Sequence, residues 1–272
     1  MELHEILGLK KYQIIDYNVL ISKLNKKNLK YNVLTSGSKS LDEVLGGGFY
    51  TSKKYLVFGT NKTGKTQLCH QLCVQAYDLF ISKLNRKSSK FIYFLDTENT
   101  FRPERIKDLS LSSNKNYREI LANILVSKIM SNSAFLLTLK NLEPILKKNK
   151  GGVLIIDTIN NHYNSELGNR NITFNKSKEV FIKILDLINL FTTKYNLITI
   201  ATAQVSFNLA KESVIQVQPV GNPYLNHYFS EYLYLSFKEE VKSYVHLVNS
   251  IKFPEKKLLY QITAKGIQDY KY

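Results

Sequence analysis

One short stretch combines glycine, lysine and threonine at a spacing that suits phosphate binding. Residues 59–66 read GTNKTGKT, two glycines separated by four residues and followed by lysine and threonine. The glycines let backbone N–H groups wrap around phosphates, and a helix after the loop adds the partial positive charge of its N-terminus. Lys65 would reach the β- and γ-phosphates, and the Thr66 hydroxyl would complete the ligand shell of Mg²⁺. The stretch therefore predicts a nucleoside triphosphate site, lined by Gly59, Thr60, Asn61, Lys62, Thr63, Gly64, Lys65, Thr66 and Gln67.

Carboxylates follow two further apolar runs. Asp157 ends GGVLIID, where it could hold the water shell of Mg²⁺ opposite Thr66. Strands that end in aspartate are common, so Asp157 alone is weak evidence for a Mg²⁺ site. The phosphate loop elsewhere in the sequence strengthens this interpretation. Asp96 and Glu98 follow a second run, and a carboxylate facing the γ-phosphate could orient and deprotonate the attacking water. Spacing alone leaves open which of the two does so.

The elements that must position these residues are continuous apolar strands alternating with helices. Helical spacing of apolar residues marks 66–84 and 178–196. Such strands between long helices predict an α/β fold, with a mostly parallel sheet covered on both faces. The four expected strands are within 53–59, 90–98, 151–159 and 197–205. After Pro223, short alternating stretches at 231–237, 243–251 and 257–269 predict an antiparallel extension of the sheet.

Polar, punctuated segments at 112–118, 164–176 and 206–222 are expected to be loops. The last two come after strand ends, and ligands bind at that edge of an open parallel sheet.

Composition narrows the partners and the compartment. The 272-residue chain carries a formal charge of +16, which favours an anionic partner such as nucleic acid, although the abundant lysine could also be a solvated surface. No apolar run reaches the roughly 18 residues needed to cross a bilayer, and the N-terminus does not read as a signal peptide. Cys69 and Cys73 lie four apart and are expected to be small buried hydrophobes in a reducing compartment. We expect a cytoplasmic or nucleoid-associated protein, nuclear in a eukaryote.

Five segments in the same order along the chain together resemble one family. They are TSGSKSLDEVLGGG, GKTQLCHQLCV, DTENTFRPER, IIDTINNHY and QPVGNPYLNHYFSEYLYL. The chain resembles the core ATPase domain of the RecA-type recombinases, in the branch of archaeal RadA and its eukaryotic counterparts. The resemblance begins near Leu34 and implies a RecA-like P-loop ATPase core at 34–272 after a short appendage or linker at 1–33. It also implies ATP and Mg²⁺ as cofactors.

Carried over by position, the resemblance assigns roles that spacing could not. Glu98 matches the glutamate that activates water, and Gln204 matches the residue that senses the γ-phosphate, so Lys65, Glu98 and Gln204 form the expected catalytic set. Arg105 matches an arginine that lies against adenine. His227 and Pro254 match residues that a neighbouring subunit supplies to the nucleotide. Without the resemblance, His227 would be interpreted as a surface or satisfied core histidine.

The resemblance also implies two DNA-binding loops, after the strands that end near Asp157 and Gln204. Arg170 matches a phosphate-contacting arginine of the first loop, and the shorter second loop carries Phe207 and Lys211. Cations that track phosphates suit single-stranded DNA, with double-stranded DNA as a further candidate and a solvated charged loop as the alternative.

The sequence departs from the family pattern in three ways, and the first two bear on assembly. Fewer than about 35 residues precede the core, where the family has a helical DNA-binding domain. The family's Phe-x-x-Ala linker motif is replaced by residues 18–21, Asn-Val-Leu-Ile, next to Tyr17, and loss of a buried aromatic anchor weakens association. Lys62 and Asn99 also differ from the residues usual at their positions, but both should be tolerable.

Three hypotheses follow. The first is an ATP-dependent, single-stranded-DNA-binding protein of homologous recombination and repair that self-associates and promotes strand pairing and exchange. The second is a non-filamentous paralogue that assists a full-length recombinase. The third is a RecA-fold ATPase unconnected with DNA, whose salt-insensitive or absent DNA binding would set it apart.

Overall fold

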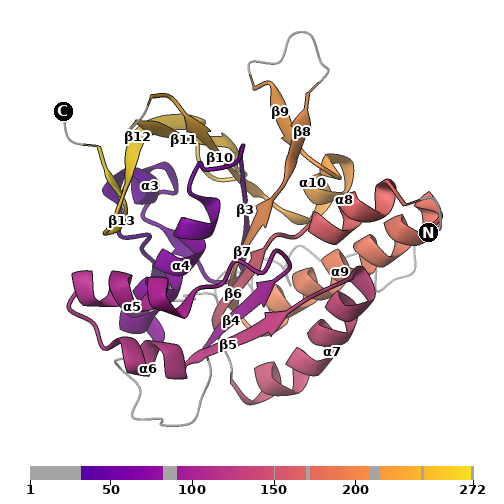
Figure 1. Ribbon diagram of the computed structural model, residues 1–272, viewed down its shortest axis with the longest axis horizontal. Coiled ribbons are helices and arrows are strands. Elements are labelled where there is room, and N and C mark those ends of the chain that lie inside the picture. Colours follow the sequence, from indigo (N-terminus) through magenta and orange to yellow (C-terminus); the bar gives the residue numbers. More distant parts are fainter. Residues whose placement is uncertain are drawn as a thin grey trace, which may run out of the picture. The chain divides into compact units, whose positions relative to one another are not determined.

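A computed structural model describes residues 32–81, 91–149, 151–169, 172–208, 215–239 and 242–270 (Figure 1). From Val33 onward the chain forms one compact unit. All but the last two residues of the predicted appendage lie outside the described residues, so its boundary at residue 33 stays a prediction.

One large sheet organises the described residues, with strands in the order β13-β12-β11-β10-β3-β7-β6-β4-β5. Its six parallel strands are β3 (Lys53–Phe58), β4 (Ile92–Asp96), β5 (Ile124–Lys128), β6 (Gly152–Asp157), β7 (Leu197–Ala203) and β10 (Glu231–Phe237). The antiparallel extension consists of β11 (Ser243–Asn249), β12 (Lys256–Thr263) and β13 (Gly266–Asp269). The predicted fold class, a mostly parallel sheet with a C-terminal antiparallel extension, is confirmed.

Two strands differ from the expectation. β5 was not expected, because it is an edge strand with only three apolar residues, Ile-Leu-Val, and its side chains are mostly half-buried. β10 alternates like an antiparallel strand, yet it pairs in parallel with β3, with Leu233 opposite Val57. The chain reaches it through α10 (Asn222–Tyr228), which lets it run in the direction of β3.

Helices cover both faces of the sheet (Figure 1). One layer holds α3 (Lys39–Val44), α4 (Lys65–Ala76), α5 (Pro103–Ser112) and α6 (Tyr117–Ala122); the other holds α7 (Asn132–Lys148), α8 (Asn161–Leu167), α9 (Phe174–Lys194) and α10. Alternate strand residues serve the two layers: Val57 packs in the first core and Leu56 in the second. This two-sided burial explains why the strands are continuously apolar.

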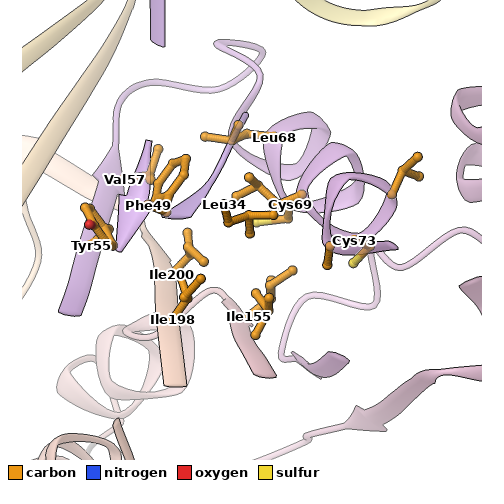
Figure 2. Packing of buried hydrophobic residues seen from close by; sticks show 14 of the residues in the cluster. Leu34, Phe49, Tyr55, Val57, Leu68, Cys69, Cys73, Ile155, Ile198 and Ile200 are labelled. Atoms are coloured by element: carbon orange, nitrogen blue, oxygen red, sulfur yellow. The ribbon is translucent and has the colours of Figure 1, made fainter. Parts of the chain in front are cut away.

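Helix α4, which extends into a π-helical turn (η2, Tyr77–Ile81), packs its cysteines against the sheet. Figure 2 shows Cys69 and Cys73 among Leu34, Ile155 and other apolar residues of the first core. Both thiols are free and fully buried, and burial raises the pKa of each thiol above its usual range. The prediction of two small buried hydrophobes is confirmed.

All three predicted loops contain regular structure, and segment 112–118 includes the last residue of α5 and the first two residues of α6. Segment 164–176 includes the end of α8 and the start of α9, so only residues 168–173 lie between the two helices. Segment 206–222 contains the hairpin of β8 (Val205–Phe207) and β9 (Val217–Pro219), which projects from the body (Figure 1), and the start of α10. The remaining pair is β1 (Val33–Leu34) with β2 (Phe49–Tyr50). Among the described residues, no helix combines the length and apolar character needed to cross a membrane.

Candidate nucleotide site

The phosphate-binding stretch forms the turn between β3 and α4. Gly59 and Gly64 have φ of +153° and +92°, and Gly64 is the N-cap of α4. A Cβ on Gly59 would lie 2.1 Å from the carbonyl oxygen of Leu235 in β10. Close packing against the neighbouring strand therefore requires glycine at this position, and it brings the loop's backbone to the start of the helix.

The antiparallel extension braces this loop from one side. The Tyr260 hydroxyl, fully buried on β12, donates to the carbonyl of Thr63 at 2.5 Å. A Cβ on Gly64 would lie 2.8 Å from the end of the Ile262 side chain, so β12 closes over the loop at two points. Inside the loop, the Thr63 hydroxyl donates to the carbonyl of Thr60.

Lys65 and Thr66 lie in the first turn of α4, as the motif requires. The Lys65 ammonium donates to the carbonyls of Gly59 and Thr60, each at 2.9 Å, and burial lowers its pKa although Asp157 and Glu98 oppose the shift. The Thr66 hydroxyl donates to Oδ2 of Asp157 at 2.8 Å. The chain thus brings together a cation for phosphate and two oxygen ligands for a divalent ion.

Asp157 ends β6 and is almost fully buried. Its carboxylate also accepts hydrogen bonds from Thr100 at 2.8 Å and from Thr202 at the end of β7. Hydroxyl groups from several elements therefore fix the orientation of this carboxylate.

The two acids at the end of β4 and just beyond it have different surroundings. Asp96 is 1% exposed and accepts from the backbone N–H groups of Glu98, Thr100 and Phe101 at 3.0–3.2 Å, so it shapes the turn. Glu98 is exposed, lines the cavity described below, and accepts hydrogen bonds from the Thr158 hydroxyl and the Gln204 side chain. Only Glu98 is therefore available to reach a ligand.

Gln204 follows β7 and lies directly beside Glu98. Its side-chain nitrogen donates to Oε1 of Glu98 at 2.7 Å. Because β4 and β7 end at the same edge of the sheet, the two residues meet although 106 positions separate them.

These residues share one cavity of about 970 Å³, a size typical of small-molecule sites. Its lining comprises Gly59, Thr60, Asn61, Lys62, Gly64, Lys65, Thr66, Gln67, Glu98, Asp157, Thr158, Gln204, Val205, Ser206, Phe207, Val217 and Ile262. Thr63, the remaining residue of the predicted lining, is buried and does not line the cavity.

The hydrogen-bond donors and oxygen ligands that line the cavity suit ATP with Mg²⁺. A nucleotide's phosphates would be held by the loop's backbone N–H groups and Lys65. Among the described residues no group of three or more His, Cys, Asp and Glu side chains gathers as a metal site. Mg²⁺ is usually held by one or two carboxylates together with substrate phosphates, which suits Thr66 and Asp157.

The remaining predicted site residues lie elsewhere. Arg105 on α5 donates to the Gln67 side chain at 2.7 Å and to the carbonyl of Ala264 at 2.7 Å, which places it beside the cavity but not in its lining. His227 on α10 and Pro254, between β11 and β12, are exposed and also outside the lining. Their expected roles across a subunit interface stay predictions. Arg170 and Lys211 lie outside the described residues.

Four residues around the site were not singled out from the sequence: Thr158, Asn161, Asn164 and Tyr260. The run of asparagines in DTINNHYN, directly after Asp157, was the available signal for two of them. Tyr260 gave none, because its contact with the loop joins residues 197 positions apart.

Comparisons with known proteins agree with this geometry. The sequence profile of the Rad51 family matches residues 27–270. The chain is 26% identical over 250 residues to the DNA repair and recombination protein RadA of Cenarchaeum symbiosum (strain A), covering 91% of this chain. It spans 61% of the length of that relative. The chain belongs to the Rad51 family, in the RadA/Rad51 branch of the RecA-type recombinases.

Proposed function

We infer that the protein is a DNA-dependent ATPase of homologous recombination and repair, which binds single-stranded DNA when it holds ATP. The observation that carries this inference is the cavity itself. It joins the phosphate loop, Glu98 and Gln204 at one edge of the sheet. Its lining also includes Ser206 and Phe207 of the projecting β8–β9 hairpin.

In the proposed reaction each residue has a separate task. Lys65 and the loop's backbone N–H groups neutralise the phosphates, while Thr66 and Asp157 hold Mg²⁺. Mg²⁺ held by these two residues would supply positive charge to the negative charge that develops on the phosphate oxygens. Glu98 orients and deprotonates the attacking water, and the Gln204 side chain beside it is the proposed contact to the γ-phosphate.

The proposed DNA partner rests on charge and on position. The chain carries a formal charge of +16, and a cationic surface gains affinity for nucleic acid by releasing counterions. Phe207 is 80% exposed on β8, where a base could stack on its ring. The hairpin and the loop after α8 correspond to the two segments that the family resemblance assigns to DNA. The relative's printed name, a DNA repair and recombination protein, supports the same role.

Hydrolysis measured with and without single-stranded DNA tests the proposal. We expect DNA to stimulate turnover, and we expect Glu98→Gln to lower it by about 10²- to 10⁴-fold, as loss of a general base does. Glu104→Gln, an exposed glutamate outside the cavity, is the matched control and should behave as wild type. A rate of hydrolysis that does not change when single-stranded DNA is added would contradict the DNA role. Full activity of Glu98→Gln would contradict the mechanism.

The sequence at residues 18–21 favours a second candidate, an accessory protein of a full-length recombinase. Asn-Val-Leu-Ile stands where the family's linker carries its aromatic anchor, so self-association through this contact should be weak. Light scattering with ATP and single-stranded DNA separates the two. Growth of large particles supports a filament, whereas persistent small oligomers favour the accessory role.

A further inference from the structure

The side chain of Gln204 is engaged on three sides. Its nitrogen donates to Glu98 at 2.7 Å and to the Asn161 side-chain oxygen at 3.0 Å. Its oxygen accepts from the Asn164 side-chain nitrogen at 3.0 Å. Gln204 therefore joins the candidate catalytic glutamate to helix α8.

Asn161 and Asn164 are placed to act together. They lie three positions apart in α8, so their side chains share one face of the helix. Asn161 also donates to the carbonyl of Thr97 at 2.7 Å, the residue before Glu98. The helix thus contacts both the turn that carries the glutamate and the glutamine.

The backbone of Gln204 is fixed independently of its side chain. The buried Asn160 accepts from the Gln204 N–H at 2.8 Å, and it donates to the carbonyls of Gln204 and Val220 at 2.9 Å each. These bonds favour a rearrangement of the Gln204 side chain over a movement of its backbone.

The number of hydrogen-bond donors on the Gln204 amide limits the contacts that this side chain can make at one time. A glutamine side chain has two N–H donors, and both are already used, one by Glu98 and one by Asn161. If Gln204 contacts the γ-phosphate, as the proposed function requires, one of these bonds must be given up. Because the amide oxygen and nitrogen belong to one planar group, a rotation that changes the contacts of the nitrogen also changes the bond between the oxygen and Asn164.

We propose that Asn161 and Asn164 are positioning residues that pass the presence of the γ-phosphate from Gln204 to helix α8. The helix ends at Leu167, and its C-cap Gly168 leads into the loop at 168–173, which the family resemblance assigns to DNA. This proposal rests on the proposed function, because it takes the γ-phosphate as its input. It adds a second output, through α8, beside the β8–β9 hairpin.

A single tryptophan tests the relay without DNA. The chain contains none, so Leu167→Trp, at a partly exposed site in the last turn of α8, gives an isolated fluorescence signal. We expect its emission to differ between ADP and a non-hydrolysable ATP analogue. Asn164→Ala in the same background should abolish most of that difference. Asn164→Asp, which has the same size but cannot donate, should do the same. Ser165→Ala, the exposed neighbour, should preserve it.

Binding of single-stranded DNA supplies the second measurement. The ratio of affinities with the ATP analogue and with ADP should fall about fivefold in Asn164→Ala, the effect of one net hydrogen bond, and should remain unchanged in Ser165→Ala. The relay is overturned if the tryptophan emission is the same with ADP and with the ATP analogue. It is also overturned if neither Asn164 variant changes the difference in emission. A nucleotide-dependent signal without DNA binding supports the relay and contradicts the DNA role.

Discussion

The two walls of the nucleotide cavity are built differently. The wall formed by the phosphate loop is held by backbone contacts and buried groups, such as the Thr63 carbonyl bonded by Tyr260 and the packing of Gly59 on β10. The opposite wall presents Glu98 and Gln204, which are exposed or half-buried and bond to each other through their side chains. Asn164 lies outside the lining and bonds to the Gln204 side chain from behind this wall.

The two walls meet two different requirements, the binding of phosphates and the response to the γ-phosphate. Phosphates bind best to backbone donors that are fixed beforehand, because no ordering is then needed on binding. A signal that depends on the γ-phosphate needs partners that can exchange, and exposed side-chain hydrogen bonds exchange at little cost because water replaces them. Substitutions on the first wall should therefore change stability, whereas those on the second should change the response to nucleotide.

The largest effect on stability is expected at Gly59. Gly59→Ala places a Cβ 2.1 Å from the Leu235 carbonyl at a φ of +153°, so either the strands separate or the loop moves. We expect a loss of about 3 kcal/mol or more in the free energy of unfolding, measured by urea denaturation. Gly168→Ala is the control, since its nearest neighbour lies 3.7 Å away and the change should stay within about 0.5 kcal/mol. Equal losses in the two variants would contradict the close-packing argument.

Of the two acids at the end of β4 and just beyond it, Asp96 should affect stability and Glu98 should affect activity. Asp96→Asn removes one of the two oxygens that bind backbone N–H groups, so we expect a loss of about 2 kcal/mol in the free energy of unfolding. Glu98→Gln, at an exposed position, should change that free energy by less than about 0.5 kcal/mol while it lowers hydrolysis by about 10²- to 10⁴-fold. Denaturation and turnover measured on both variants check this. A destabilised Glu98→Gln would mean that the second wall is structural as well.

Two buried tyrosines give a smaller and more specific contrast. Tyr260→Phe leaves the Thr63 carbonyl without its donor, so we expect a loss of about 1–2 kcal/mol and weaker nucleotide binding. The Tyr232 hydroxyl is buried without a partner among the described residues, so Tyr232→Phe should be neutral or slightly stabilising. Urea denaturation and nucleotide titration of both variants compare them. If Tyr260→Phe and Tyr232→Phe lower the free energy of unfolding equally, the ring of Tyr260 rather than its hydroxyl braces the loop.

Local patterns predicted the first wall better than the second. The loop at 59–66, the apolar strands and the antiparallel extension follow from spacing and periodicity, which act between neighbours in sequence. Spacing left Asp96 and Glu98 undecided, because the choice depends on which carboxylate the turn's own backbone captures. The contacts of Tyr260, and those of Asn161 and Asn164 with Gln204, join distant strands and helices. No local pattern encodes them.

His70 connects the two walls and gives the smallest expected effect, through pH. Its Nε2 accepts from the N–H of Arg102, in the segment after Glu98, so Nδ1 carries the hydrogen and donates to the carbonyl of Thr66. Burial lowers the pKa of this imidazole below its usual value of about 6.5. Protonation would place a hydrogen on Nε2 and remove the acceptor for Arg102.

The sign of the pH effect follows from this depressed pKa. Between the folded pKa and about 6.5 the unfolded chain binds more protons than the native one, so the free energy of unfolding falls as the pH is lowered through that window. The contribution is fully present above the unfolded pKa, and its slope is at most about 1.4 kcal/mol for each pH unit. Urea denaturation at several pH values from 7.5 to 5 should show this fall in wild type, and a shallower one in His70→Gln. Parallel slopes in the two proteins would mean that the link between the walls does not depend on a neutral imidazole.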